Sequence, residues 1–138
     1  MTKIRIGNYV YFDAEVQDLN VLPLLECLRF AINDGQPLEH YLKGILPPGE
    51  GGYCGGDPGW EICGSDNDLK NWYDGAGNRL YYAWTHQPVS ELDPCDGYYP
   101  VDVVRHHVRE VLENFRNLNP GRSAEVDAAI KRFELENA

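Results

Sequence analysis

The most regular hydrophobic pattern in this chain lies between Val101 and Leu118. Apolar residues recur there at three- and four-residue steps, which is the spacing of one face of an α-helix. Pro100 precedes the pattern, where its fixed φ angle suits a helix start, and Asn119-Pro120-Gly121 follows it as a stop signal. The segment predicts a long amphipathic helix, which has to pack its apolar face against a second layer.

Three other segments also have helical spacing. One begins near Val21, with Asn20 as a candidate N-cap, and stops before Asp34-Gly35. A shorter one follows Pro37, and a last helix after Ser123, its predicted N-cap, pairs with the long helix as a helical hairpin. The apolar positions on the faces of these three segments are Val21, Leu24, Leu25, Leu28 and Ile32, then Leu38, Tyr41, Leu42 and Ile45, then Val126, Ala129, Ile130 and Phe133.

The predicted strands are short and do not alternate with the helices. Residues 3–6 and 9–12 form a first hairpin about Gly7-Asn8, and further strands are expected at 60–63 and 79–84. This order favours an α+β fold, a small and mostly antiparallel sheet with helices on one face and a C-terminal helical hairpin. A chain of 138 residues is expected to form a single domain, residues 1 to 138.

Between these elements, residues 49–59 are rich in glycine and proline. We expect a loop, because glycine and proline sustain neither a helix nor a long central strand. The glycines match neither the P-loop nor the dinucleotide-binding pattern, and Glu50, Asp57 and Glu61 would repel a phosphate. Nucleotide binding is therefore not expected.

Negative charge and aromatic residues gather in the middle of the chain, residues 46–104. This stretch contains two basic residues, Lys70 and Arg79, and ten acidic residues, so it carries −8 of the chain's net charge of −10. All three tryptophans and six of the nine tyrosines also lie in it. Such side chains either fill the core or form an interface anchor surrounded by acids.

The cysteines and histidines do not form a recognisable catalytic or metal motif. Cys27 falls in an apolar helical pattern and is expected in the core, while none of the cysteine spacings is that of a structural zinc site. Adjacent His106 and His107 point about 100° apart on a helix, so they cannot share a metal in the usual i, i+4 way. We therefore expect reduced thiols and neither a metal nor a cofactor.

Asp66-Asn67-Asp68 begins like a calcium loop, but Lys70, the missing glycine at the sixth position and Gly77 at the twelfth depart from the motif.

Composition argues against several partners. Nucleic-acid binding needs a basic stripe, whereas the aromatics here lie among acids, and Arg105, Arg109 and Arg116 are balanced by neighbouring glutamates. No apolar stretch approaches the roughly 20 residues that span a bilayer, and the first residues lack the apolar core of a signal peptide. A cytoplasmic protein that binds neither nucleic acid nor membrane is expected.

In size, in its acidic aromatic loop-and-sheet region and in its lack of a signal or catalytic motif, the chain resembles the small acidic immunity proteins that bacteria make against toxins. The resemblance is one of class, so it assigns no role to individual residues. It implies a cognate toxin, often a nuclease, that is neutralised by occlusion.

The leading hypothesis is a stoichiometric inhibitor of a basic toxin. Trp60 and Trp72 are expected to be exposed anchors, because they neighbour loop glycines and acids. The alternatives are a small enzyme that uses Cys54 or Cys63 with His86 and Asp93, or a non-inhibitory intracellular binding module. The predicted contact residues are Glu50, Asp57, Trp60, Glu61, Asp66, Asp68, Trp72 and Asp74.

Overall fold

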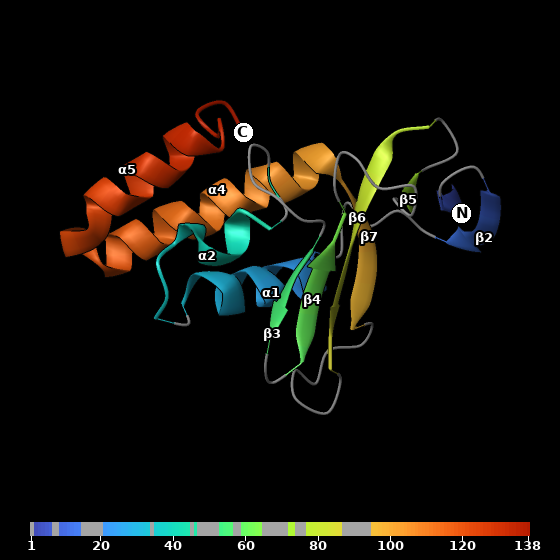
Figure 1. Cartoon of the computed structure of the whole chain (residues 1–138), viewed down its shortest axis with the longest axis horizontal. Coiled ribbons are helices and arrows are strands. Elements are labelled where there is room, and N and C mark those ends of the chain that lie inside the picture. Colours follow the sequence, from blue (N-terminus) through green and yellow to red (C-terminus); the bar gives the residue numbers. More distant parts are fainter. Residues whose placement is uncertain are drawn as a thin grey trace.

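The computed structural model shows helices packed on one side of an antiparallel sheet (Figure 1). It describes residues 2–6, 9–14, 21–33, 35–44, 46, 53–56, 59–64, 72–73, 77–86 and 95–138. The predicted α+β class is confirmed, and every described strand pair is antiparallel. The prediction of a single domain stays a prediction.

The described strands form one seven-stranded sheet in which β6 is central. Ala83 of β6 lies between Ile62 of β4 and Gly97 of β7, so β4 and β7 pair with opposite edges of this strand. β5 continues the β4 edge and joins the hairpin of β1 and β2 to the sheet. The strands are β1 (Thr2–Ile6), β2 (Tyr9–Ala14), β3 (Tyr53–Gly56), β4 (Trp60–Cys63), β5 (Trp72–Tyr73), β6 (Arg79–Thr85) and β7 (Asp96–Pro100).

Two helices, α1 (Leu22–Ile32) and α4 (Val101–Leu118), contact each other and cover the same face of β6 and β7. α5 (Ser123–Arg132) packs on α4 and completes the predicted helical hairpin, while α2 (Glu39–Leu42) contacts α1 and β3. A 3₁₀ turn, η1 (Pro120–Arg122), links α4 to α5. In Figure 1 the helices lie together on one side of β3, β4, β6 and β7, and the N-terminal hairpin lies beyond the far end of β6.

The core confirms most of the helical faces predicted from spacing. Val104, Val108, Leu112 and Phe115 of α4 are buried, as are the predicted positions Leu24, Leu28 and Ile32 of α1. Leu118 was expected on the same stripe of α4, but it is the last residue of the helix and is 71% exposed. The sheet contributes Trp60, Ile62, Tyr81, Ala83 and Tyr99 to the same cluster.

The prediction of a loop throughout residues 49–59 was wrong for Tyr53–Gly56, which forms β3. Glycine suits this strand because the neighbouring strand β4 approaches closely. A Cβ atom on Gly55 would lie 2.7 Å from the carbonyl oxygen of Trp60. Gly59, at φ +132°, adopts a conformation suited to glycine in the turn before β4.

The sequence prediction also missed β5 and β7, and two helix starts differ from expectation. Val21 occupies the N-cap position of α1, so Asn20, which lies outside the described residues, is not the cap. Ser123 is the first residue of α5 rather than its N-cap, and its hydroxyl donates to the carbonyl oxygen of Pro120 at 3.0 Å. Among the described helices, none is both long and apolar enough to cross a membrane.

Candidate functional site

The sheet face turned away from the helices gathers acidic and aromatic side chains in two rows. Side chains alternate between faces along a strand, and residues paired across strands share a face. Pairing therefore places Trp84 beside Glu61 on one side and Asp96 on the other. In the next row Tyr82 lies between Cys63 and Tyr98. We call this surface, made of Glu61, Cys63, Tyr82, Trp84, Asp96 and Tyr98, the aromatic–acidic face.

Hydrogen bonds hold the two carboxylates against the aromatic side chains. The indole Nε1 of Trp84 donates to Oε1 of Glu61 at 3.2 Å, and the thiol of Cys63 donates to the same oxygen at 2.8 Å. The hydroxyl of Tyr82 donates to Oδ2 of Asp96 at 2.8 Å. Partial burial, and then the bond to Asp96, raise the pKa of Tyr82 above its ordinary value, so the phenol stays a donor. These hydrogen bonds therefore orient both carboxylates beside the aromatic rings.

The aromatic–acidic face is partly accessible and carries negative charge. Asp96 is exposed, and Glu61, Trp84, Tyr82 and Tyr98 are half-buried. None of the ion pairs found within the described ranges involves Glu61 or Asp96. This face therefore places two carboxylates, without an ion-pair partner in the described part of the chain, beside large aromatic rings.

Trp60, predicted to be an exposed anchor, is instead a core residue with 3% of its surface exposed. Its pairing with Thr85 turns it toward the helices. There its ring meets Tyr41 edge-on, with ring centroids 5.2 Å apart, and stacks with Phe30 at 6.3 Å. The expectation was wrong because neighbouring loop glycines say nothing about which face of a strand a side chain occupies.

Of the other predicted contact residues, Glu61 lies on the aromatic–acidic face. Trp72 lies in β5, where its backbone pairs with Leu80. The remaining five, which lie outside the described residues, are Glu50, Asp57, Asp66, Asp68 and Asp74.

Five members of the face were not predicted as contacts: Cys63, Tyr82, Trp84, Asp96 and Tyr98. The signal available for two of them was the alternation in Arg79–Thr85, where Tyr82 and Trp84 share a side opposite Tyr81 and Ala83. Asp96 and Tyr98 could not be found in that way, because β7 was not predicted as a strand.

Cys27 confirms its predicted place in the core. Its side chain is fully buried, and its thiol donates to the carbonyl oxygen of Trp84 at 3.3 Å. Burial raises the pKa of Cys27 to about 12, so the thiol stays protonated at neutral pH.

The structure does not bring Cys63 and His86 together. Cys63 pairs with Tyr82, whereas the backbone N–H of His86 donates to Gly59 at 2.8 Å, four residues along the strand. That offset separates the two backbones by about 13 Å, beyond the hydrogen-bond reach of the side chains. Asp93 and the side chain of Cys54 lie outside the described residues.

The arginines of α4 are engaged with protein atoms. Arg105 donates to the carbonyl oxygens of Phe133 and Glu134, and Arg109 donates to those of Leu135 and Glu136. Arg116 pairs with Glu113 at 3.0 Å and with Asp127 at 2.7 Å. These guanidinium groups hold the C-terminal segment and α5 against α4.

The two adjacent histidines of α4 have the exposures expected for one residue at the flank and one in solvent. The side chain of His107 is 17% exposed, and that of His106 is 56% exposed. Both rings nevertheless turn toward Glu110, a carboxylate that was not considered with them in the sequence.

Comparison of the chain with protein-family models, with curated proteins and with solved structures gives no match. The functional argument therefore depends on the geometry of the described residues.

Proposed function

We propose that this protein is a cytoplasmic, stoichiometric inhibitor of the immunity-protein kind, which binds and neutralises a basic toxin domain through its aromatic–acidic face. The observation that carries the proposal is the row of Glu61, Trp84 and Asp96, in which two carboxylates that form no ion pair with the described residues flank an indole. The acidic character of the whole chain, with a net charge of −10, adds to it.

Each part of the face matches a requirement of rapid and tight binding. Negative charge draws a basic surface in and accelerates association, and the effect weakens as salt screens it. Tryptophan and tyrosine supply large contact areas with few rotatable bonds, and they are enriched among residues that dominate binding energy. Because Trp84 and Tyr82 are already held by Glu61 and Asp96, little side-chain freedom is lost on binding.

A basic nuclease is one toxin class that fits this chemistry. Its cleft attracts polyanionic nucleic acid, so an acidic aromatic surface can occupy the cleft or an adjacent patch and exclude the substrate. A non-inhibitory partner would be bound by the same attraction, and only the loss of partner activity separates the two functions.

The first experiment is affinity capture of the tagged protein from its native cells at low salt, with a high-salt wash as comparison and mass spectrometry as the readout. The captured partner is then produced separately for kinetics. The test variant is Glu61→Gln/Asp96→Asn, in which the new amide oxygens still accept from Trp84, Cys63 and Tyr82. The control, Glu134→Gln/Glu136→Gln, removes two exposed negative charges from the C-terminal segment that packs on α4.

We expect one basic partner in a one-to-one complex whose activity falls in proportion to the inhibitor added. The test variant should associate at least about tenfold more slowly at low salt and depend less on salt, while the control behaves like the parent protein. Equal association rates for the folded test variant and the control would remove the aromatic–acidic face from the proposal. A one-to-one complex with a fully active partner would exclude inhibition.

A further inference from the structure

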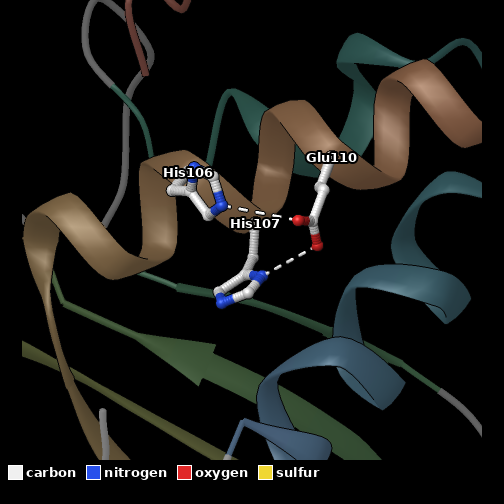
Figure 2. Close-up of side chains that lie close together, drawn as sticks. All are labelled: His106, His107 and Glu110. Carbon is white, nitrogen blue, oxygen red and sulfur yellow. Dashed lines mark hydrogen bonds and ion pairs between the residues drawn. The ribbon is translucent and has the colours of Figure 1, made fainter. Parts of the chain in front are cut away.

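His106, His107 and Glu110 form a compact cluster on α4 (Figure 2). Nε2 of His106 lies 3.4 Å from Oε2 of Glu110, and Nδ1 of His107 lies 3.2 Å from Oε1 of the same carboxylate. The two imidazole rings meet edge-on, with centroids 5.1 Å apart. One ligand atom from each residue lies within 4.8 Å of the other two.

Helix geometry explains how two adjacent histidines reach one carboxylate. Glu110 lies four residues after His106 and three after His107, and both spacings bring side chains together across one helical turn. The histidines leave the helix about 100° apart, and Glu110 lies between their directions on the next turn. Each of its oxygens faces one ring, as Figure 2 shows.

We propose that His106, His107 and Glu110 bind a divalent transition-metal ion of the zinc class. Two imidazole nitrogens and a carboxylate oxygen are a donor set that suits zinc and its neighbours better than calcium or magnesium, which prefer oxygen alone.

The distances suit a tetrahedral ion. Zinc bonds of about 2.0–2.1 Å at tetrahedral angles place ligand atoms about 3.3–3.4 Å apart. The two histidine-to-carboxylate separations, 3.4 and 3.2 Å, are each close to this value. They end on different oxygens of Glu110, and all three ligand atoms lie within 4.8 Å of one another, so rotation of the side chains is needed to bring them around one ion.

The position of the cluster leaves room for further ligands. His106 and Glu110 have side chains that are 56% and 57% exposed, so water or an atom of another molecule can complete the coordination. Three protein ligands with one open position are the arrangement of accessible zinc sites rather than closed structural ones. An ion bound here therefore keeps a position open for an external ligand.

The test uses the full chain and Zn²⁺ alone, with isothermal titration calorimetry as the measurement. His106→Asn and Glu110→Gln are the test variants, because both side chains are largely exposed and their replacement leaves the core intact. His40→Asn is the matched control, since His40 is also exposed but lies on α2. Co²⁺ absorption spectra of the same proteins report whether a thiolate is a ligand, because cysteines also bind zinc.

We expect one Zn²⁺ per chain, a Co²⁺ spectrum without a thiolate charge-transfer band, and an unchanged affinity in the control. Each test variant should bind Zn²⁺ more than about tenfold more weakly, since even outer-shell changes at zinc sites cost 10- to 100-fold. Absence of Zn²⁺ binding by the parent chain would overturn the proposal. So would a thiolate band, or equal affinities in the control and both test variants.

Discussion

At the scale of single residues, burial sets how costly it is to ionise a thiol. Cys27 and Cys63 carry the same thiol, but Cys27 lies in the core against the carbonyl oxygen of Trp84, whereas Cys63 is half-buried beside Glu61. Water is excluded around Cys27, so the charged thiolate is costly there. The helical spacing predicted this position correctly, because a small apolar-like residue on the buried stripe of a helix faces the core.

Cys27 should make stability depend on pH in the alkaline range. Folding raises its pKa from 9.0 to about 12, so above pH 9 the unfolded chain holds fewer protons than the folded one. The free energy of unfolding should therefore fall as pH rises from about 9, with a slope approaching about 1.4 kcal/mol per pH unit from this residue. Urea titrations of the parent chain and of Cys27→Ser at pH 8 to 10 measure it.

In Cys27→Ser the hydroxyl can still donate to Trp84 but does not titrate in this range. The slope should be smaller in this variant between pH 9 and 10, below the ordinary pKa of the tyrosines. Tyr82 and Tyr99, whose pKa values are also raised chiefly by burial, add a fall in the same direction only at higher pH. Identical slopes in the two proteins would show that Cys27 titrates normally in the folded state.

At the scale of elements, strand register decided which tryptophan could serve an interface. Trp60 and Trp84 lie on neighbouring strands but on opposite faces, because Trp60 pairs with Thr85 and Glu61 pairs with Trp84. A shift of one residue would exchange the faces. Both strands were predicted from the sequence, but their register, and therefore the membership of the aromatic–acidic face, was not.

The contact between α5 and the segment before α2 gives a second prediction at this scale. Oε1 of Glu125 accepts the backbone N–H of Leu38 at 2.9 Å, and Leu38 is fully buried. Glu125→Ala leaves that N–H without its acceptor and should lower the free energy of unfolding by about 1–3 kcal/mol. Glu125→Gln keeps an acceptor oxygen and loses only the ion pair with Arg122, so it should cost less than about 1 kcal/mol.

Chemical denaturation at pH 7 compares these two variants. The bond from Arg122, and then that from Leu38, lower the pKa of Glu125, so its charge stabilises the fold above its ordinary pKa of 4.5. That contribution disappears as pH falls through the lowered value, and it is missing from Glu125→Gln. Equal losses in the Ala and Gln variants at pH 7 would show that the Leu38 contact adds nothing.

At the scale of the whole molecule, β6 and the N-terminal hairpin differ in their strand pairing and in the helices that cover them. β6 pairs along both edges and is covered by α1 and α4. In the described part of the chain, the hairpin of β1 and β2 joins the sheet through the pairs Arg5 with Tyr73 and Ile6 with Trp72. Fewer hydrogen bonds have to break to release the hairpin than to open β6, so the two parts should differ in local stability.

Native-state hydrogen exchange measured by mass spectrometry tests this difference. Amides in residues 2–14 should exchange at least about tenfold faster than those in residues 79–85 after correction for intrinsic rates, which corresponds to about 1.4 kcal/mol of local stability. Equal protection would mean that the hairpin opens only together with the rest of the sheet. In that case the hairpin belongs to the same cooperative unit as β6.

Local sequence patterns were enough to predict a helix from near Val21, a helix over 101–118, a last helix after Ser123, strands at 60–63 and 79–84, and the α+β class. These depend on local spacing and on proline and glycine positions, which neighbouring residues specify without help from the rest of the chain. Packing between segments that are distant in the sequence was needed to show that Trp60 is buried and that Trp84 stands between Glu61 and Asp96. Strand register, rotamers and the pairing of β7 arise from contacts between distant segments, and the sequence pattern of one segment does not contain them.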